Sequence, residues 1–193
     1  MRLILASSSR YRQEMLERLG LPFTAVSPDI DETPLPGESP AALALRLSLA
    51  KAQAVAPAYP GALVIGSDQV ATMDGSPIGK PGNFERAAAQ LEQLSGLTVE
   101  FHSALCVSDG RRHEIDDVVT RCRFRSLTRA EITSYLRREQ PYDTAGSAKA
   151  EGLGIALMES MQSDDPTAII GLPLIALSRM LRAFGLNPLT HPH

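Results

Sequence analysis

The feature that most constrains this chain is an apolar run that ends in charged and amide side chains. Residues 63–65 read Leu-Val-Ile and residues 66–69 continue as Gly-Ser-Asp-Gln, while residues 79–81 read Gly-Lys-Pro. A buried strand with Asp68 at its end, followed by a tight turn around Lys80, would place a carboxylate and an ammonium at one edge of a sheet. Ligands of open α/β sheets bind at the edge where the strands end. The pattern is typical of a phosphate-handling enzyme, because water attack assisted by a metal needs a carboxylate.

Length and composition favour one folded unit with its own core. The chain has 193 residues, of which 44% are apolar and 21% are charged, so we expect a single domain over residues 1–193. The net charge of −3 argues against nucleic acid as a partner, because nucleic-acid binding surfaces are basic.

The cysteines and the N-terminus bear on where the protein works. Cys106 and Cys122 have no histidine pair nearby, so we expect buried free thiols of a reducing cytosol rather than a zinc site. The apolar stretch at residues 3–6 is too short for a signal peptide, and no run approaches the roughly 20 apolar residues of a membrane span. We therefore expect a cytoplasmic protein with no membrane partner.

Apolar periodicity and capping residues predict alternating strands and helices. Ser39, Asn83 and Thr128 are expected helix N-caps, and the Asp-Gly pair at residues 109–110 predicts a hairpin. Strands are predicted at 3–6, 23–27, 63–71, 98–107 and 116–124, helices at 10–19, 40–56, 83–94, 129–138 and 174–184, a glycine-rich strand-loop-strand at 143–159, and a frayed tail at 187–193.

Three serines stand where the first predicted strand meets the first helix. Ser7 and Ser9 would bring hydroxyls and free backbone N–H groups to a helix N-terminus, which attracts anions. Arg12, in the first turn of that helix, would add a bidentate phosphate contact. An ordinary serine N-cap beside solvated arginines explains the same residues, and this segment alone leaves both interpretations open. It is not a Walker A loop, because the glycines of that motif are absent.

Seven short motifs together give the chain a family resemblance. They are Ala-Ser-Ser-Ser-Arg-Tyr-Arg at 6–12, Asp-Glu-Thr at 31–33, Lys-Ala at 51–52, Gly-Ser-Asp-Gln at 66–69, Gly-Lys-Pro at 79–81, Ala-Gly-Ser at 145–147 and Gly-Leu-Pro at 171–173. In this order, from residue 3 to about residue 188, they resemble the Maf proteins. The resemblance implies a two-lobed α/β fold of the Maf and ITPase-like kind, in which helices flank an extended mixed sheet with a central cleft. It also implies a nucleoside triphosphate pyrophosphatase that cuts between the α- and β-phosphates, a divalent cation (Mg²⁺ or Mn²⁺) as cofactor, and a homodimer.

Two segments point to one branch of that family. Gly-Ser-Asp-Gln, rather than Gly-Ala-Asp-Thr, and Lys-Ala-Glu-Gly at residues 149–152 resemble the branch that hydrolyses 7-methyl-GTP to 7-methyl-GMP and diphosphate, which removes a modified nucleotide. Two residues depart from the family pattern. Arg10 replaces a common proline and adds a surface charge or a phosphate contact. Ala148 replaces a usual aromatic residue where the base should bind, so a broader pyrophosphatase for UTP, dTTP or other modified triphosphates stays an alternative.

The resemblance assigns roles at the phosphate end of the substrate. Asp68 would be the general base and, with Glu32, a ligand of the divalent cation. Lys51, Lys80 and Arg12 would neutralise the phosphate charge. The structural alternatives are a carboxylate that caps a turn for Asp68, a solvated loop acid for Glu32 and a solvent-facing helix lysine for Lys51.

Tyr11, Gln69 and Glu151, together with Lys149, form the expected specificity set. Methylation at N7 makes guanine cationic, so Tyr11 would stack on it and Glu151 would accept hydrogen bonds from N1–H and the exocyclic amine. The alternatives are a core-packed Tyr11 and a surface Glu151 paired with Lys149. A rival of another class is a nucleotide-sensing regulator of cell division, which needs phosphate clamps but no base. The presence of Asp68 together with Glu32, Lys51 and Lys80 favours an enzyme.

Overall fold

The computed structural model describes residues 1–191, in which helices flank a seven-stranded sheet, as expected for the fold class. In chain order the elements are β1 (Leu3–Ala6), α1 (Arg10–Glu17), β2 (Phe23–Val26), α2 (Pro40–Val55), η1 (Ala56–Ala58), β3 (Leu63–Met73), β4 (Ser76–Ile78), α3 (Phe84–Leu94), β5 (Thr98–Ser108), β6 (His113–Phe124), α4 (Arg129–Glu139), η2 (Ala145–Ser147), η3 (Leu153–Leu157), β7 (Met158–Gln162), η4 (Ala168–Ile170) and α5 (Leu174–Ala183). Here η denotes a 3₁₀-helix. The tail predicted to fray forms a turn in which Thr190 N donates to Asn187 O, and residues 192–193 lie outside the described residues.

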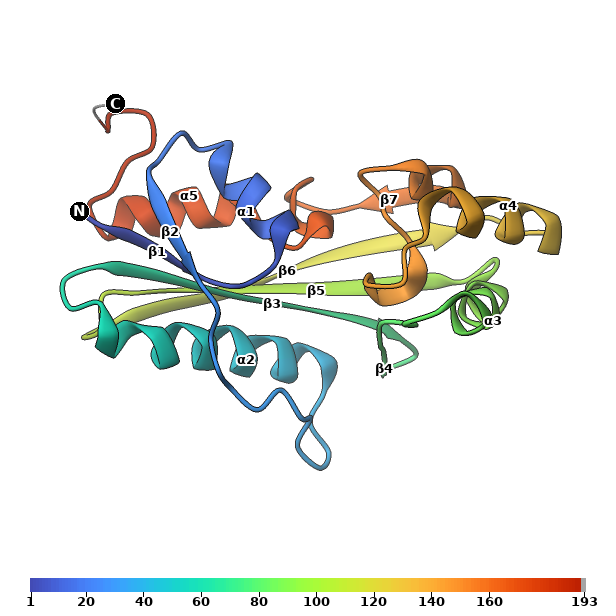
Figure 1. Cartoon of the computed structure of the whole chain (residues 1–193), viewed down its shortest axis with the longest axis horizontal. Helices are drawn as coiled ribbons and strands as arrows, with labels where there is room; N and C mark the ends of the chain where they lie inside the picture. Colours follow the sequence, from blue (N-terminus) through green and yellow to red (C-terminus); the bar gives the residue numbers. More distant parts are fainter. Residues whose placement is uncertain (192–193) are drawn as a thin grey trace.

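The sheet mixes parallel and antiparallel strands. Its order is β2-β1-β3-β5-β6-β7, and β4 pairs with β3 beside this path. β1 runs parallel to both β2 and β3, whereas β3, β5, β6 and β7 pair antiparallel in that order. The long strands β3, β5 and β6 extend along the molecule and connect its two ends (Figure 1).

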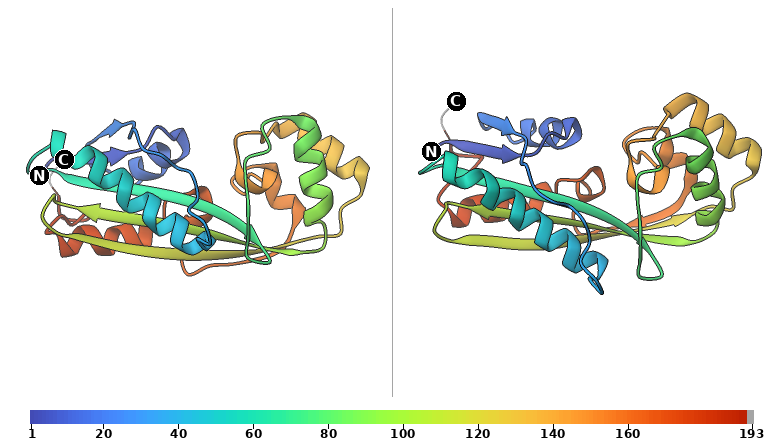
Figure 2. Two further views of the ribbon diagram at one scale, coloured as in Figure 1. Left: turned by 90° about the horizontal axis from the view of Figure 1, so that it is seen from below. Right: turned by 60° about the horizontal axis from the view of Figure 1, so that its bottom comes forward.

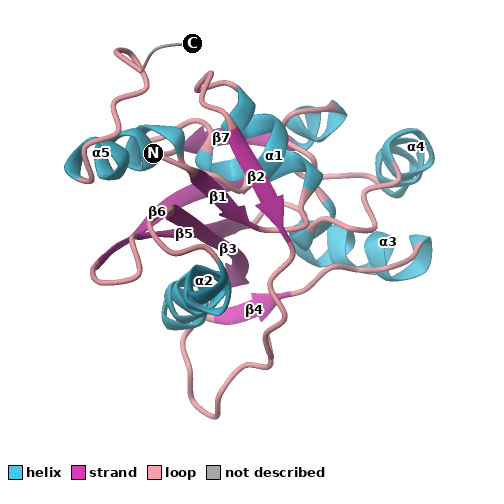
Figure 3. Cartoon of the chain, turned by 60° about the vertical axis from the view of Figure 1, so that its left-hand side comes forward, coloured by secondary structure: helices cyan, strands magenta, loops and turns pink. Residues whose placement is uncertain are grey.

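Helices cover both faces of the sheet at the end that contains the termini. Leu3 and Leu5 of β1 face α1 and α5, whereas Ile4 of the same strand and Val64 of β3 face α2. Figures 1 and 3 show α1 and α5 on one side of the strands and α2 on the other. Strands that are buried on both faces have apolar residues at every position, which explains the continuous apolar runs in the sequence.

A second lobe surrounds the other end of the long strands. There α3 and α4 pack with β7, η2 and η3 (Figure 2). Phe101 of β5, Leu91 of α3 and Leu136 of α4 belong to its apolar core. The middle of β3 and β5 therefore lies between two separately packed lobes, which is where a cleft can form.

The predicted N-caps are confirmed. Ser39 Oγ accepts from Ala42 N at 3.2 Å, and Asn83 Oδ1 accepts from Arg86 N at 2.9 Å. Thr128 begins α4 with the predicted capping box, in which the side chain of Glu131 bonds back to the Thr128 N–H at 2.8 Å. These caps satisfy N–H groups of the first helical turn that have no partner inside the helix.

The strand-loop-strand prediction for residues 143–159 is wrong at its start. This segment forms the 3₁₀-helices η2 and η3, and a strand begins only at Met158. Gly146 and Ser147 adopt φ values of 74° and 55°, which break any extended run. A Cβ on Gly154 would lie 2.4 Å from the carbonyl oxygen of Lys149, so the chain folds back tightly on itself here.

The tight turn predicted around Lys80 is also wrong. Residues 79–82 form an irregular link between β4 and α3, without a turn. The turn lies earlier, at Asp74 and Gly75, whose φ values of 49° and 77° close the short β3–β4 hairpin. Sequence analysis missed β4 because Pro77 lies in its middle, and proline is rare inside strands.

Two further expectations concern the thiols and membrane insertion. Cys106 and Cys122 are free and buried, as predicted, and burial raises the pKa of each thiol to about 12. Among the described residues, no helix combines the length and the apolar character needed to cross a bilayer.

Candidate active site

A cavity of about 450 Å³ opens where the two lobes meet, a volume typical of small-ligand sites. It brings together almost all the predicted site residues, although they come from segments far apart in the sequence. Those that line it are Ser7, Ser9, Tyr11, Arg12, Glu32, Lys51, Asp68, Gln69, Lys80 and Glu151. Lys149 does not line the cavity, and its Nζ lies over the Tyr11 ring, 5.7 Å from the centre of that ring.

Asp68 reaches the cavity from the middle of β3, not from its end as predicted. The parallel neighbour β1 ends at Ala6, opposite Gly66, while β3 continues alongside β5 to Met73. Asp68 therefore lies just beyond the end of the parallel part of the sheet. The rule that ligands bind where parallel strands end holds here for β1 but not for β3 itself.

Gly66 lets α2 lie directly against β3. A Cβ at this residue would lie 2.0 Å from the carbonyl oxygen of Ser48 and 2.8 Å from the amide nitrogen of Ala52. Only glycine permits backbones to approach this closely. The contact places Lys51, which precedes Ala52, against the side chain of Asp68.

Lys51 joins the two carboxylates of the site. Its Nζ lies 2.7 Å from Asp68 Oδ1 and 2.8 Å from Glu32 Oε1. Lys51 is 6% exposed, so the solvent-facing alternative is wrong. Burial acts to raise the pKa of Glu32, but the bond from Lys51 and the charges of Lys51, Lys80 and Arg12 outweigh it and lower that pKa.

Arg12 reaches the same end of the cavity from α1. Its Nε donates to the carbonyl oxygen of Gly171 at 3.0 Å, and the Oγ of Ser67 lies 3.0 Å from that oxygen as well. Burial lowers the pKa of the Arg12 guanidinium, while the charges of Asp68 and Glu32 act to raise it. Arginine stays protonated even so. The side chain therefore brings a positive charge to the cavity wall.

The serine turn fits both an ordinary helix N-cap and a site for anions. Ser9 is the N-cap of α1, since its Oγ accepts from Arg12 N at 3.5 Å, and Ser7 Oγ accepts from Ser9 N at 3.1 Å. Both serines also line the cavity, at the N-terminal end of α1. Arg10, the first departure from the family pattern, pairs with Glu14 at 2.7 Å and has an 89% exposed side chain, so it is a surface charge at the cavity rim.

The donor set at this end suits a hard divalent cation that arrives with a substrate. Glu32 and Asp68 offer carboxylate oxygens to one cavity, and Oδ2 of Asp68 makes no hydrogen bond to another described residue. Residues 1–191 contain no cluster of three or more His, Cys, Asp or Glu side chains able to hold a metal ion on its own. Mg²⁺ typically takes one or two protein carboxylates and completes its shell with water and substrate phosphates. The residues present therefore fit a cation shared with a polyphosphate.

Tyr11 lines the cavity as part of a second group of interacting side chains. Its hydroxyl donates to Asp143 Oδ2 at 3.3 Å, and Asp143 Oδ1 lies 3.6 Å from Lys149 Nζ. Lys149 therefore pairs with Asp143, and not with Glu151 as the structural alternative expected. Burial acts to lower the pKa of Lys149, but contacts with Tyr11 and Asp143 raise it overall. Glu151 is exposed and makes no hydrogen bond to another described residue.

Helix α4 braces the segment that carries Glu151. Tyr135 OH accepts from Lys149 N at 3.0 Å, and Glu139 Oε1 accepts from Leu153 N at 3.1 Å. The two side chains are one helical turn apart, so they face the same way. Burial raises the pKa of Tyr135 to about 12, which keeps its hydroxyl protonated. The backbone on both sides of Glu151 is therefore fixed while its carboxylate is left free.

Gln69 lines the cavity and also holds a neighbouring segment in place. Its Nε2 lies 3.0 Å from Ser103 Oγ, 3.1 Å from Ala168 O and 3.0 Å from Ile169 O. The amide nitrogen thus holds η4 against the sheet, and Ile170 at the end of η4 lines the cavity together with Gly171. Gln69 therefore shapes the cavity wall, and its part in base selectivity stays a prediction.

Three residues of the site were not predicted from the sequence. Asp143 contacts both Tyr11 and Lys149, while Ser67 and the carbonyl of Gly171 fix Arg12. Ser67 and Gly171 belong to motifs that were recognised, so a signal was present. Their partners are not local, and no spacing in the sequence indicates them.

The match to known proteins covers nearly the whole chain. The family model described as Maf-like protein matches residues 2–184. The chain belongs to the Maf family.

Several curated relatives of this Maf protein carry one name. A 7-methyl-GTP pyrophosphatase of Bordetella avium is 74% identical over 99% of the chain and 97% of the relative. The protein of that name from Bordetella pertussis is 73% identical over 99% of the chain and 96% of the relative. The one from Burkholderia thailandensis is 67% identical over 95% of the chain and 88% of the relative.

A solved structure shares the fold. A HAM1 protein from Coxiella burnetii has a TM-score of 0.55 at 18% identity, over 95% of this chain and 99% of that one. At this level of identity the likeness concerns the fold alone.

Proposed function

We propose that this protein hydrolyses 7-methyl-GTP between the α- and β-phosphates, giving 7-methyl-GMP and diphosphate. The observation that carries the proposal is a single cavity lined by two separate groups of side chains. Lys51 joins Asp68 and Glu32 in one group, called the phosphate end, and Tyr11 and Glu151 belong to the other, called the base end. The names of relatives that are up to 74% identical over nearly full length support the same substrate.

At the phosphate end, Asp68 accepts a proton from the attacking water. One of its oxygens is held by Lys51 and the other makes no hydrogen bond to a described residue, so the carboxylate is oriented and has an acceptor to offer. Lys51, Lys80 and Arg12 bring positive charge to the wall where the leaving diphosphate gains negative charge. Water adds to the α-phosphorus as the bond to the bridging oxygen breaks, so one hydroxyl joins the monophosphate and diphosphate leaves.

Glu32 and Asp68 would hold the divalent cation, Mg²⁺ or Mn²⁺, together with phosphate oxygens. The bound cation supplies Lewis-acid polarisation of the phosphates and further charge neutralisation. Lys51 lies between the two carboxylates, so its charge offsets the repulsion between acids that are close together.

At the base end, Tyr11 would stack on the methylated ring and Glu151 would accept its N1–H and amine hydrogen bonds. The free and exposed Glu151 is suited to this, since no protein group competes for its oxygens among the described residues. Lys149 supports Tyr11 by lying over its ring. Ala148, a buried small residue on the cavity wall, leaves room beside the base, so UTP and dTTP belong in the same test.

We further propose that the enzyme acts in the cytoplasm as a homodimer and needs neither nucleic acid nor a membrane. Size-exclusion chromatography with light scattering decides the oligomeric state.

A panel of triphosphates tests the proposed function. The purified protein is incubated with Mg²⁺ or Mn²⁺ and 7-methyl-GTP, GTP, UTP or dTTP, and the products are identified by chromatography. We expect 7-methyl-GTP to react fastest and to give diphosphate. A preference for a pyrimidine triphosphate would keep the chemistry and refute the base-end assignment. Binding without turnover of any triphosphate would favour a nucleotide sensor.

A further inference from the structure

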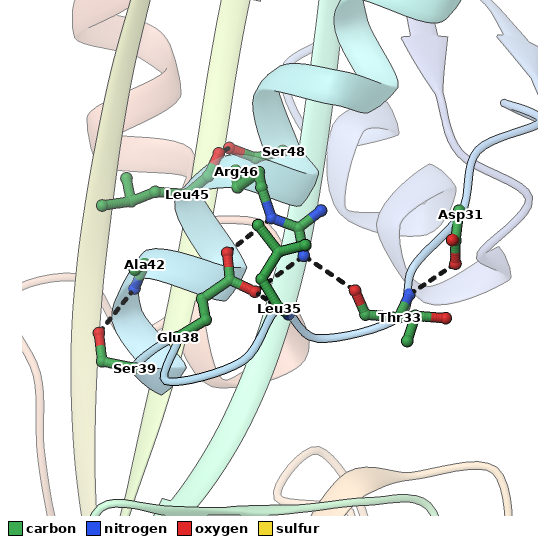
Figure 4. A network of polar contacts seen from close by, with 9 residues as sticks. All are labelled: Asp31, Thr33, Leu35, Glu38, Ser39, Ala42, Leu45, Arg46 and Ser48. Carbon is green, nitrogen blue, oxygen red and sulfur yellow. Dashed lines mark hydrogen bonds and ion pairs between the residues drawn. The ribbon is translucent and has the colours of Figure 1, made fainter.

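An ion pair outside the cavity fastens the loop that carries Glu32. This loop, residues 27–39, joins β2 to α2. Arg46 of α2 donates from Nε to Glu38 Oε1 at 2.6 Å and from Nη2 to Glu38 Oε2 at 2.8 Å. Figure 4 shows this two-pronged contact between helix and loop. Paired bonds of this kind fix orientation as well as distance.

The same guanidinium also holds the backbone next to Glu32. Arg46 Nη2 donates to the carbonyl oxygen of Thr33 at 3.1 Å (Figure 4). Asp31 Oδ1 accepts from Thr33 N at 2.9 Å, and Glu38 Oε2 accepts from Leu35 N at 3.0 Å. Thr33, the residue that follows Glu32, is therefore held at both its N–H and its carbonyl oxygen.

This pair is better shielded from water than comparable pairs on the surface. The side chains of Arg46 and Glu38 are 31% and 8% exposed, whereas those of Arg123 and Glu159 are 57% and 58% exposed at a similar distance. The bond from Arg46, followed by that from Leu35 N–H, lowers the pKa of Glu38 to about 2. A shielded pair keeps its geometry in salt more firmly than an exposed one.

We propose that Arg46 and Glu38 are positioning residues that hold Glu32 beside Lys51 and thereby set the affinity of the phosphate end for its divalent cation. Neither residue lines the cavity, so both act through the loop. The loop contains Pro34, Pro36 and Gly37 and no regular structure, so without the pair Glu32 would sample many positions and ordering it would cost entropy. This inference rests on the proposed function.

Arg46→Lys and Glu38→Gln test it. Lysine keeps the charge but lacks the planar fork, and glutamine keeps the shape of glutamate without its charge. We expect each variant to raise the half-saturating Mn²⁺ concentration for hydrolysis about tenfold, as losing an outer contact of a metal ligand does. The rate at saturating Mn²⁺ should change much less, and the preference for 7-methyl-GTP over GTP should not change. Amide hydrogen exchange of residues 28–39, followed by mass spectrometry, should become faster in both variants.

Arg123→Lys is the matched control, because it alters an arginine–glutamate pair of 2.7 Å between β6 and β7, away from the cavity. It should leave the Mn²⁺ requirement and the exchange of residues 28–39 unchanged. An unchanged Mn²⁺ requirement in both test variants, or an equal shift in the control, overturns the inference. If the wild type hydrolyses no triphosphate, the proposed function fails. In that case the positioning role is judged by hydrogen exchange alone, and exchange of residues 28–39 at the wild-type rate in both variants overturns it.

Discussion

The phosphate end and the base end of the cavity are built from different kinds of structure. At the phosphate end Asp68 and Lys51 lie on β3 and α2, and both are buried. At the base end Glu151 lies on an irregular segment between two 3₁₀-helices, and its carboxylate is exposed. Asp68 and Lys51 thus depend on long regular elements in backbone contact. Glu151, like Glu32 at the phosphate end, depends on a loop held by side chains of a helix.

This difference assigns catalysis to the phosphate end and substrate selectivity to the base end. Groups that move protons and neutralise phosphate must keep fixed positions, and regular elements hold side chains more accurately than loops do. Groups that recognise a base can change with less effect on the fold, because loops tolerate substitution. We therefore expect substitutions at the phosphate end to affect rate and stability, and substitutions at the base end to affect substrate preference.

The largest effect is expected for Asp68→Asn. Loss of a general base lowers kcat by about a thousandfold, within the range measured for such groups. The affinity for 7-methyl-GTP, measured by calorimetry in EDTA so that the loss of a cation ligand does not enter, should not fall because the amide keeps the shape of the carboxylate. A variant with near-normal turnover would place the base elsewhere.

A pair of glycine substitutions compares the stability of the two ends. Gly66→Ala should destabilise the fold by about 3 kcal/mol, because the new Cβ meets the backbone of α2 and overpacking costs this much. Gly152→Ala should cost only about 1 kcal/mol, the value of one hydrogen bond, since its Cβ meets the carboxylate of Glu139 rather than backbone and displaces it from Leu153 N–H. Urea denaturation followed by circular dichroism measures both. Equal losses would contradict the proposed contrast between the ends.

Glu151→Gln should act on selectivity alone. The amide cannot offer two acceptor oxygens to N1–H and the amine, so the ratio of kcat/KM for 7-methyl-GTP over GTP should fall about tenfold, the equivalent of one good charge-assisted bond. Glu159→Gln, on β7 outside the cavity, is the matched control. An unaltered ratio for Glu151→Gln would remove this residue from base recognition.

The smallest effect concerns acid stability of α4, the helix that braces the base end. Bonds from Thr128 and then Arg125 lower the pKa of Glu131 to about 2. Because the folded pKa lies below the ordinary value of 4.5, the stabilisation is complete above about pH 4.5 and is lost as pH falls toward 2. Glu131→Gln should therefore give a flatter curve of unfolding free energy against pH in this window, measured by urea titration. An identical slope in the two proteins would refute this role.

Helix caps and buried strands were predictable from the sequence because they depend on interactions between residues that are near one another in the chain. The caps at Ser39, Asn83 and Thr128 are set by side chains that bond within one helical turn, so the sequence indicates them directly. The buried strands were equally visible as apolar runs. Residues 143–159 were misread because the positive φ of Ser147 depends on surrounding contacts, and serine has no local preference for it.

The candidate site was predictable as a set of residues but not as an arrangement. Motifs identified Asp68, Glu32 and Lys51, and the structure adds that one ammonium joins both acids. Nothing in the sequence distinguished a solvent-facing Lys51 from a buried one. The close approach of α2 to Gly66, which buries Lys51, is a packing event between elements.

By itself, the sequence determined most strands and helices, their caps, the buried apolar runs and the family, because each depends on local composition or on recognisable motifs. Only the tertiary structure decided which groups meet. The partners Lys51 and Asp68 are 17 residues apart, Tyr11 and Asp143 are 132 apart, and Arg12 and Gly171 are 159 apart. Such contacts form when the sheet brings distant segments to one cavity, and no local preference of either residue encodes its partner.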